Sequence, residues 1–245
     1  MIISPLFIML IVPTMLFAFW AQWKVSSTFK RYSEVPTRKG LTGASVAENI
    51  LRDHGISLSD DPSGELACAV EPTAGELTDH YDPRDRTLRL SESVYGSNSV
   101  AALGVAAHEV GHAIQHANLY GPLVLRNIAY PVSNFSSKAA VPLFLVGIVA
   151  YAFAGMPQVG LLAVHAAIAF FTVAVFFTVV TLPVEFNASK RALAALSSGG
   201  YVTSDELQGA KKVLDAAAMT YVAAAAMALA QLVHWILIAA SMGRD

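Results

Sequence analysis

The sequence predicts a mainly α-helical membrane protein with four transmembrane helices and a small α+β domain. The 245 residues are 55% hydrophobic and only 14% charged, whereas soluble domains usually carry about 25% charged residues. Mean hydropathy is +0.51, and four apolar stretches are long enough to cross a bilayer. The net charge of -2, with no basic block, argues against a nucleic-acid partner. The lone Cys68 excludes an intrachain disulfide and a cysteine-based zinc site.

The first apolar stretch, residues 1–23, is expected to form an uncleaved transmembrane helix. It carries no charge before Lys24 and is long enough to span a bilayer. It lacks the positive start and the small-residue cleavage site of a signal peptide. Trp20 and Trp23 suit a membrane interface.

Residues 24–138 are expected to form a domain on the basic side of the membrane. An amphipathic helix is predicted over 40–56, with Thr42 or Ser45 as its cap. Strands are predicted over 66–70 and 87–91, because their residues are apolar or alternate with polar ones.

The strand at 87–91 directly precedes the most informative motif, so its role matters. We expect its edge to be exposed, so that an extended peptide could pair with it. The alternative is an ordinary sheet that only covers the helix that follows, and the two readings are compatible.

The most informative motif is His108-Glu109-Val110-Gly111-His112, within a helix predicted over 98–117. Histidines four residues apart lie on one helix face, one turn apart, so both can bind a single zinc ion. The neighbouring Glu109 can then take the proton of a water at the metal, as the general base of a hydrolase. The motif therefore predicts a zinc-dependent, zincin-like domain.

The remaining chain alternates apolar and polar segments. A connecting helix is predicted over 123–138, and residues 139–184 are expected to form a hairpin of the second and third transmembrane helices. A helix is expected to start near Pro183, so that 185–216 is a surface segment. Residues 217–245 are expected to hold the fourth transmembrane helix and a short tail.

The distribution of basic residues predicts the orientation of these spans. Of sixteen lysines and arginines, eleven lie in 24–138, four in 185–216 and one at Arg244. Four spans place both basic-rich segments on one side, which the positive-inside rule makes cytoplasmic. Glu185 then emerges on the side that carries the motif.

A catalytic zinc ion needs a third protein ligand beside the two histidines. His116 lies about 12 Å along the helix from His108, too far to share an ion with it. Glu185 is the favoured candidate, since it is a carboxylate on the same side of the membrane. The alternative is a carboxylate that only caps a helix at the membrane interface.

Several runs resemble the YugP-type family of bacterial membrane zinc metallopeptidases. They are Leu77-Thr-Asp-His-Tyr-Asp-Pro83, Leu88-Arg-Leu-Ser91, Ala106-Ala-His-Glu-Val-Gly-His-Ala-Ile-Gln115 and Leu182-Pro-Val-Glu-Phe186. The run Glu185-Phe-Asn-Ala-Ser189 also resembles the E-x-x-A-D element of HtpX-type and CAAX-prenyl-protease-type membrane zincins, which supplies the third ligand. Ser189 stands where that element has Asp, so Asn187 or Ser189 is expected to orient a ligand histidine.

The resemblance implies a membrane-embedded zinc endopeptidase with Glu109 as general base and His108, His112 and Glu185 as metal ligands. His80 or Tyr81 is a candidate stabiliser of the transition state, with an ordinary turn around Asp79 and Asp82 as the alternative. The expected location is the bacterial inner (plasma) membrane, multi-pass, with the site facing the cytoplasm. The expected partners are the bilayer and a peptide or membrane-protein substrate.

Two other functions are compatible with these residues. In an intramembrane site-2-type protease, the motif helix itself spans the bilayer and an Asp supplies the third ligand, for which Asp215 is the candidate. In a latent or non-catalytic scaffold, zinc is bound without turnover.

Two histidines lie inside predicted spans. His165 and His234 fall at similar depths, and ionisable groups within a bilayer usually face the bundle interior and find a partner. We expect them to face each other or to share a polar neighbour, with two histidines bonded independently to backbone or interfacial water as the alternative.

Overall fold

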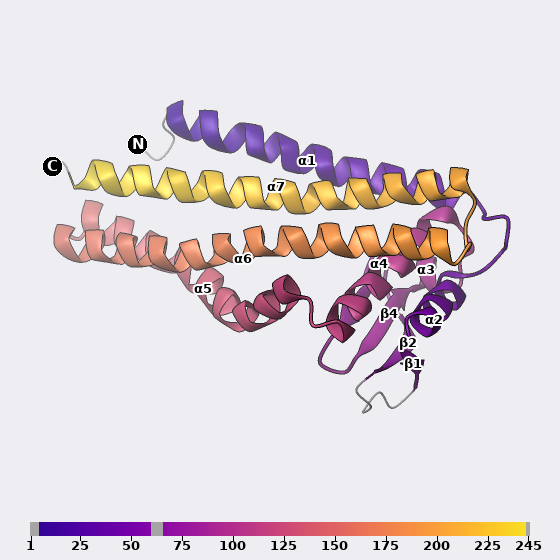
Figure 1. Ribbon diagram of the computed structural model, residues 1–245. Coiled ribbons are helices and arrows are strands. Elements are labelled where there is room, and N and C mark those ends of the chain that lie inside the picture. The colour runs from indigo at the N-terminus through magenta and orange to yellow at the C-terminus, as the bar shows by residue number, and fades with distance from the viewer. Residues whose placement is uncertain (1–4, 60–65, 244–245) are drawn as a thin grey trace. The chain divides into compact units, whose positions relative to one another are not determined.

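The computed structural model describes residues 5–59 and 66–243, which are mainly helical (Figure 1). The helices are α1 (Pro5–Ser33), α2 (Gly43–Asp53), α3 (Glu92–Tyr95), α4 (Val100–Ala117), α5 (Gly121–Ala152), α6 (Pro157–Ser198) and α7 (Ser204–Met242). The strands are β1 (Ser57–Leu58), β2 (Ala67–Thr73), β3 (His80–Asp82) and β4 (Thr87–Ser91). The prediction of a mainly helical protein with a small sheet is confirmed.

Four of these helices, α1, α5, α6 and α7, are long and apolar enough to cross a membrane. They are longer than predicted. The connecting helix and the second span form one helix, α5, and residues 205–241 belong to one helix, α7. The helix start expected near Pro183 is wrong, because Pro183 lies inside α6, which is continuous over 42 residues. Long apolar helices tolerate an internal proline where neighbouring groups satisfy the freed backbone.

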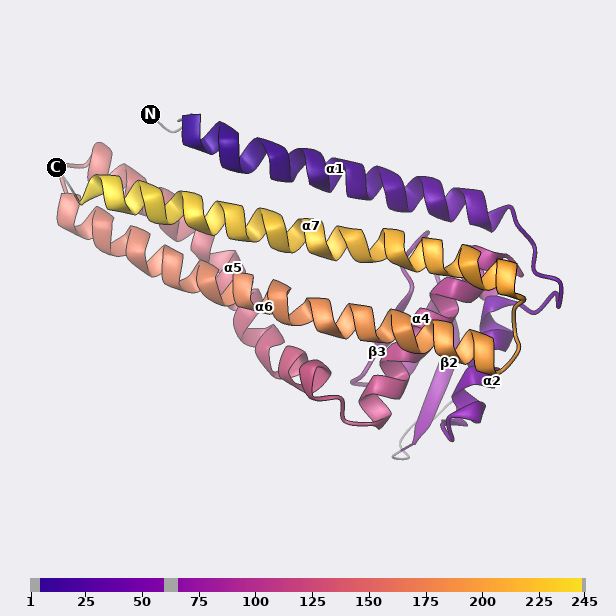
Figure 2. The same cartoon turned by 45° about the horizontal axis from the view of Figure 1, so that its top comes forward.

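The chain divides into two compact units. The first comprises Met1–Trp20, Leu125–Leu182 and Thr220–Asp245. Its apolar core joins α5, α6 and α7, which Figure 2 shows as long adjacent helices. Trp235 of α7 stacks on Phe144 of α5, with ring centroids 4.2 Å apart, and also contacts Phe171 of α6.

The two histidines of the candidate membrane-spanning helices, His165 and His234, lie in this unit, and they have separate surroundings. The exposed His165 bonds through Nδ1 to the carbonyl of Leu161, in its own helix, at 2.8 Å. His234 is buried and packs edge-on against Phe7, with centroids 5.2 Å apart. The expected contact between the two histidines is therefore not formed among the described side chains.

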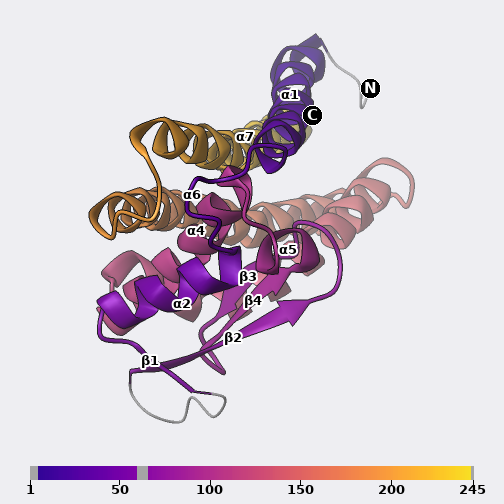
Figure 3. The ribbon, with the colours of Figure 1, turned by 90° about the vertical axis from the view of Figure 1, so that its right-hand side faces the viewer.

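The second unit, Ala21–Val124 with Pro183–Met219, contains the sheet. The strand order is β1-β2-β4-β3, with β2 and β4 parallel and β3 antiparallel to β4 (Figure 3). The expectation that 87–91 forms an exposed edge is wrong, because β4 pairs on both sides. The edge strands of the described sheet are β1 and β3, and in β3 Tyr81 lies opposite Leu88.

One apolar core holds this unit together. It contains Ile50 and Leu51 of α2, Leu88 and Leu90 of β4, Leu103 and Val110 of α4, and Leu196 of α6. Fully burying a Leu or Ile contributes about 1.5–3 kcal/mol. The prediction of an amphipathic α2 is confirmed, and Thr42 is its cap, accepting a hydrogen bond from the Ser45 N–H. The core fixes α4 between the sheet and the segment of α6 that carries Glu185.

Candidate metal centre

Helix α4 brings both histidines of the motif to one face. Ser99 caps it, accepting the Ala102 N–H at 3.2 Å, and satisfies a donor that the first turn leaves open. Fourteen of its eighteen residues are buried, so packing against the neighbouring elements determines its orientation. The rings of His108 and His112 lie one turn apart, with centroids 4.9 Å from each other.

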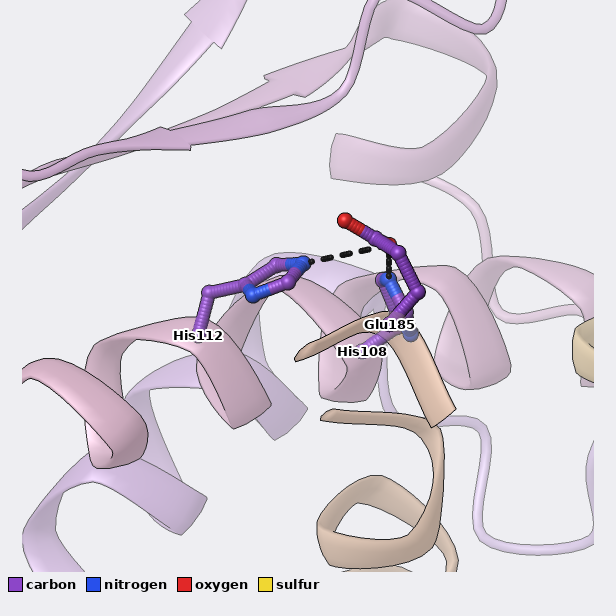
Figure 4. Close-up of side chains that lie close together, drawn as sticks. All are labelled: His108, His112 and Glu185. Carbon is purple, nitrogen blue, oxygen red and sulfur yellow. Dashed lines mark hydrogen bonds and ion pairs between the residues drawn. The ribbon is translucent and has the colours of Figure 1, made fainter. Parts of the chain in front are cut away.

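Glu185 of α6 completes the cluster (Figure 4). Its Oε2 lies 3.3 Å from Nε2 of His108 and 3.5 Å from Nε2 of His112. Two atoms that each bind a tetrahedral zinc ion at about 2.0–2.1 Å lie about 3.4 Å apart. The donor set of two imidazoles and a carboxylate is also one that catalytic zinc uses. The three residues therefore fit a zinc ion, and their donor atoms all lie within 4.8 Å of one another.

The close approach of α4 to α6 depends on Gly111. A Cβ at this position would lie 2.6 Å from the Ala188 carbonyl oxygen and 3.1 Å from its Cα. Because those atoms belong to the backbone of α6, a side chain could be accommodated only by moving the helix. The glycine inside the motif thus lets Glu185 reach the two histidines.

Each histidine is oriented by its other ring nitrogen. Ser189 Oγ lies 3.1 Å from Nδ1 of His108. Gln115 Oε1 accepts the Nδ1–H of His112 at 3.0 Å. Both contacts leave Nε2 facing Glu185, which is the arrangement a metal-binding histidine needs.

Gln115 connects the two ligand-bearing helices and was missed in the sequence. Its amide nitrogen donates to the Val184 carbonyl at 2.8 Å and to Asn187 Oδ1 at 3.0 Å. Asn187 in turn accepts from Arg191 Nε at 2.8 Å. Gln115 is fully buried, so its polar groups must find partners. A glutamine three residues after His112, following the apolar Ala113 and Ile114, was the available signal.

Glu109 lies beside the three ligands and points toward the sheet. Its Oε2 accepts a hydrogen bond from the backbone N–H of Tyr81 at 3.0 Å. This bond does not involve Oε1, the other carboxylate oxygen. The side chain is buried, and burial is the main reason that its pKa rises to about 7. The negative charge of Glu185 acts in the same direction. A carboxyl with a pKa near 7 can accept and return a proton at neutral pH.

The two candidate stabilisers of the transition state lie on β3. The exposed His80 bonds through Nδ1 to the Thr78 carbonyl at 2.7 Å. The Tyr81 hydroxyl lies 2.8 Å from His116 Nδ1. The hydroxyl is thus directed to the last turn of α4 rather than to the ligand cluster, and this contact accounts for His116.

Asp215, the ligand required by the intramembrane alternative, lies outside the ligand cluster. It is exposed and pairs with Lys211 of its own helix at 2.6 Å. Helix α4 is packed into the sheet-containing unit and is not among the helices apolar enough to span a membrane.

Comparison with known proteins identifies the relatives of this chain. The profile of a family described as "putative neutral zinc metallopeptidase" matches residues 7–240. A Bacillus subtilis (strain 168) protein named "putative membrane protease YugP" is 47% identical over 240 residues, covering 98% of this chain and 99% of that protein. No solved structure matches. The chain therefore belongs to this zinc metallopeptidase family.

Proposed function

We propose that this protein is a membrane-embedded zinc endopeptidase that cleaves extended peptide segments at the cytoplasmic membrane face. The observation that carries the proposal is the convergence of His108, His112 and Glu185 beside a separately held Glu109. A non-catalytic zinc scaffold needs the three ligands but has no use for a buried carboxylate poised next to them.

Glu109 is the proposed general base. Bound at the three ligands, zinc would supply a Lewis acid that polarises the peptide carbonyl and lowers the pKa of a water. Tyr81 N–H holds one oxygen of Glu109 in place. The other oxygen takes the proton of the attacking water and delivers it to the leaving amine. Ser189 and Gln115 keep His108 and His112 oriented by engaging their Nδ1 atoms.

We propose β3, rather than β4, as the strand along which the substrate lies. It is one of the two edges of the sheet, and its Tyr81 N–H faces Glu109 instead of β4. A peptide added to this edge would place its carbonyl groups next to the base. Asp79 anchors the start of β3, accepting the Ser91 N–H at 2.8 Å and the Ser91 hydroxyl at 2.9 Å.

The cytoplasmic orientation rests on charge. Together, the two segments of the sheet-containing unit carry thirteen of the sixteen lysines and arginines, and such segments stay on the cytoplasmic side. With the apolar helices, this leads us to propose the bacterial inner (plasma) membrane as the location. Membrane-protein segments or unfolded chains at that surface are the proposed substrates.

The decisive experiment compares the detergent-purified, zinc-loaded wild type with Glu109→Gln on a library of unstructured peptides. Removing a general base lowers turnover by typically 10²–10⁴-fold. We expect that loss in Glu109→Gln at unchanged zinc content, because Glu109 is not one of the three proposed ligands. Equal cleavage by the two proteins would refute the role of Glu109. Zinc binding without any cleavage by the wild type would instead favour the scaffold.

A further inference from the structure

A cavity of about 340 Å³ lies in the sheet-containing unit at the C-terminal end of α4. Ala113, His116 and Ala117 of α4 form one wall. Cys68 of β2 and Tyr81 of β3 also line the cavity. None of the three metal ligands lines it, so the cavity is distinct from the metal centre.

The cavity continues the helix face that carries Glu109. Ala113 and Ala117 follow Glu109 by four and eight residues, which places all three on the same side of α4. At 1.5 Å per residue, the cavity begins about 6 Å beyond Glu109 along the helix axis. Tyr81 belongs to both places, because its N–H reaches Glu109 and its side chain lines the cavity.

The walls suit an apolar side chain. Ile56, Leu66 and Leu119 add aliphatic surface to the two alanines. The polar groups of Tyr81 and His116 satisfy each other at 2.8 Å. Burial raises the pKa of the Cys68 thiol to about 12, so it stays neutral. Arg86 is the charged member of the lining, which makes an acidic side chain the competing occupant. The volume lies at the lower end of the roughly 300–1,000 Å³ typical of ligand pockets, so it suits one large side chain.

The direction of β3 indicates which substrate residue reaches the cavity. β3 runs from His80 to Asp82 and continues into the turn that contains Arg86, at the cavity wall. Antiparallel pairing is the more stable mode of strand addition. A peptide paired in this way has its N-terminal half beside the end of β3, and therefore beside the cavity.

We propose that this cavity is a specificity pocket for a large apolar side chain, located within three residues on the N-terminal side of the cleaved bond. The inference rests on the proposed peptidase function and adds a substrate class to it. An extended strand advances about 3.3 Å per residue, so three residues cover about 10 Å and reach beyond the start of the cavity, about 6 Å from Glu109 along the helix axis.

The test uses a peptide library in which each position varies among Phe, Leu, Gly and Asp, with cleavage products identified by mass spectrometry. Ala117→Phe fills the rim of the cavity, and Ala117→Ser is the matched control at the same exposed position. Thermal unfolding checks that both variants are folded. We expect the wild type and Ala117→Ser to prefer Phe or Leu roughly tenfold to a hundredfold over Gly. Ala117→Phe should lose most of that preference and still cleave the Gly peptides.

Three results would overturn the proposal: a preference that survives in Ala117→Phe, a preference for Asp, or a preference located C-terminal to the cleaved bond. Absence of any zinc-dependent cleavage would refute the proposed function separately. In that case, the proposed pocket is tested by measuring how tightly labelled versions of the same peptides bind to the zinc-loaded protein. Tighter binding of Phe peptides that is lost in Ala117→Phe would support it, and equal binding of all peptides would refute it.

Discussion

The two helix segments that build the metal centre differ in how local their contributions are. Helix α4 supplies His108, Glu109 and His112 within five residues, and the helical repeat alone places them together. Helix α6 supplies Glu185 from 77 residues away along the chain from His108. Its position depends on packing at Gly111 and on the Gln115 bridge. One half of the site is therefore a property of sequence spacing, and the other half is a property of the interface between α4 and α6.

Gly111→Ala is the strongest way to break this interface. The new Cβ would meet the Ala188 backbone oxygen at 2.6 Å and push the helices apart. We expect the free energy of unfolding to fall by about 1–3 kcal/mol, with zinc binding weakened as Glu185 withdraws. Thermal unfolding and zinc titration measure both effects.

Gly104→Ala in the same helix is the matched control for that variant. Its Cβ would lie 3.3 Å from the Ala210 Cβ and no nearer than 3.5 Å to the Ala210 backbone, an ordinary van der Waals distance, and alanine favours a helix by about 0.5–1 kcal/mol. We therefore expect little change in zinc binding. An equal loss in both variants would mean that the close approach at Gly111 has no special role.

Replacing Gln115 separates orientation of the ligand from helix bridging. Gln115→Leu removes the acceptor for His112 and both bonds to α6. Loss of such an outer partner typically weakens zinc binding 10–100-fold. Gln115→Glu keeps an acceptor for His112 and loses the donor to the Val184 carbonyl. In competition with a chelator, the wild type should bind zinc most tightly, Gln115→Glu less tightly and Gln115→Leu least tightly. Unchanged affinity in Gln115→Leu would contradict the proposed role of Gln115 in bridging the two helices.

Ser189→Ala should have a smaller effect. It removes the hydroxyl 3.1 Å from His108 Nδ1 and leaves the helix contact intact. We expect zinc affinity to fall by up to about tenfold. Ser189→Asp offers His108 a carboxylate and should restore or strengthen binding. The same chelator competition measures both variants, and a greater loss in Ser189→Ala than in Gln115→Leu would reverse the proposed ranking.

Asp215→Ala should have the smallest effect. Its exposed pair with Lys211 contributes at most about 0.5 kcal/mol, and it lies outside the ligand cluster. Zinc content should remain that of the wild type. Loss of zinc in this variant would revive the intramembrane alternative.

Elements with a local signal were predictable from the sequence. The helix expected over 98–117 is observed as Val100–Ala117, and the strand expected over 87–91 is observed as Thr87–Ser91. β3 was missed because it has only three residues and no alternating apolar pattern. Strand order was also beyond reach, because β4 looks the same in sequence whether it lies inside a sheet or at its edge.

In the candidate site, too, features with a signal in the sequence were predictable and features that depend on tertiary packing were not. Glu185 was found through charge distribution and family resemblance, although the helix was expected to start there and instead passes through. The link between Gln115 and Asn187 could not be predicted, because it depends on which faces of α4 and α6 meet. The contact of Tyr81 with His116 depends in the same way on where β3 lies relative to α4.

The central claim is that Glu185 joins His108 and His112 in holding one zinc ion. Zinc content of the detergent-purified protein tests it most directly, measured for the wild type, Glu185→Ala and His116→Ala. We expect about one zinc per chain in the wild type and in His116→Ala, and little in Glu185→Ala, because two histidines alone leave the site one ligand short. Full zinc retention in Glu185→Ala would contradict the assignment of Glu185 as a ligand and would mean that the third ligand is another residue.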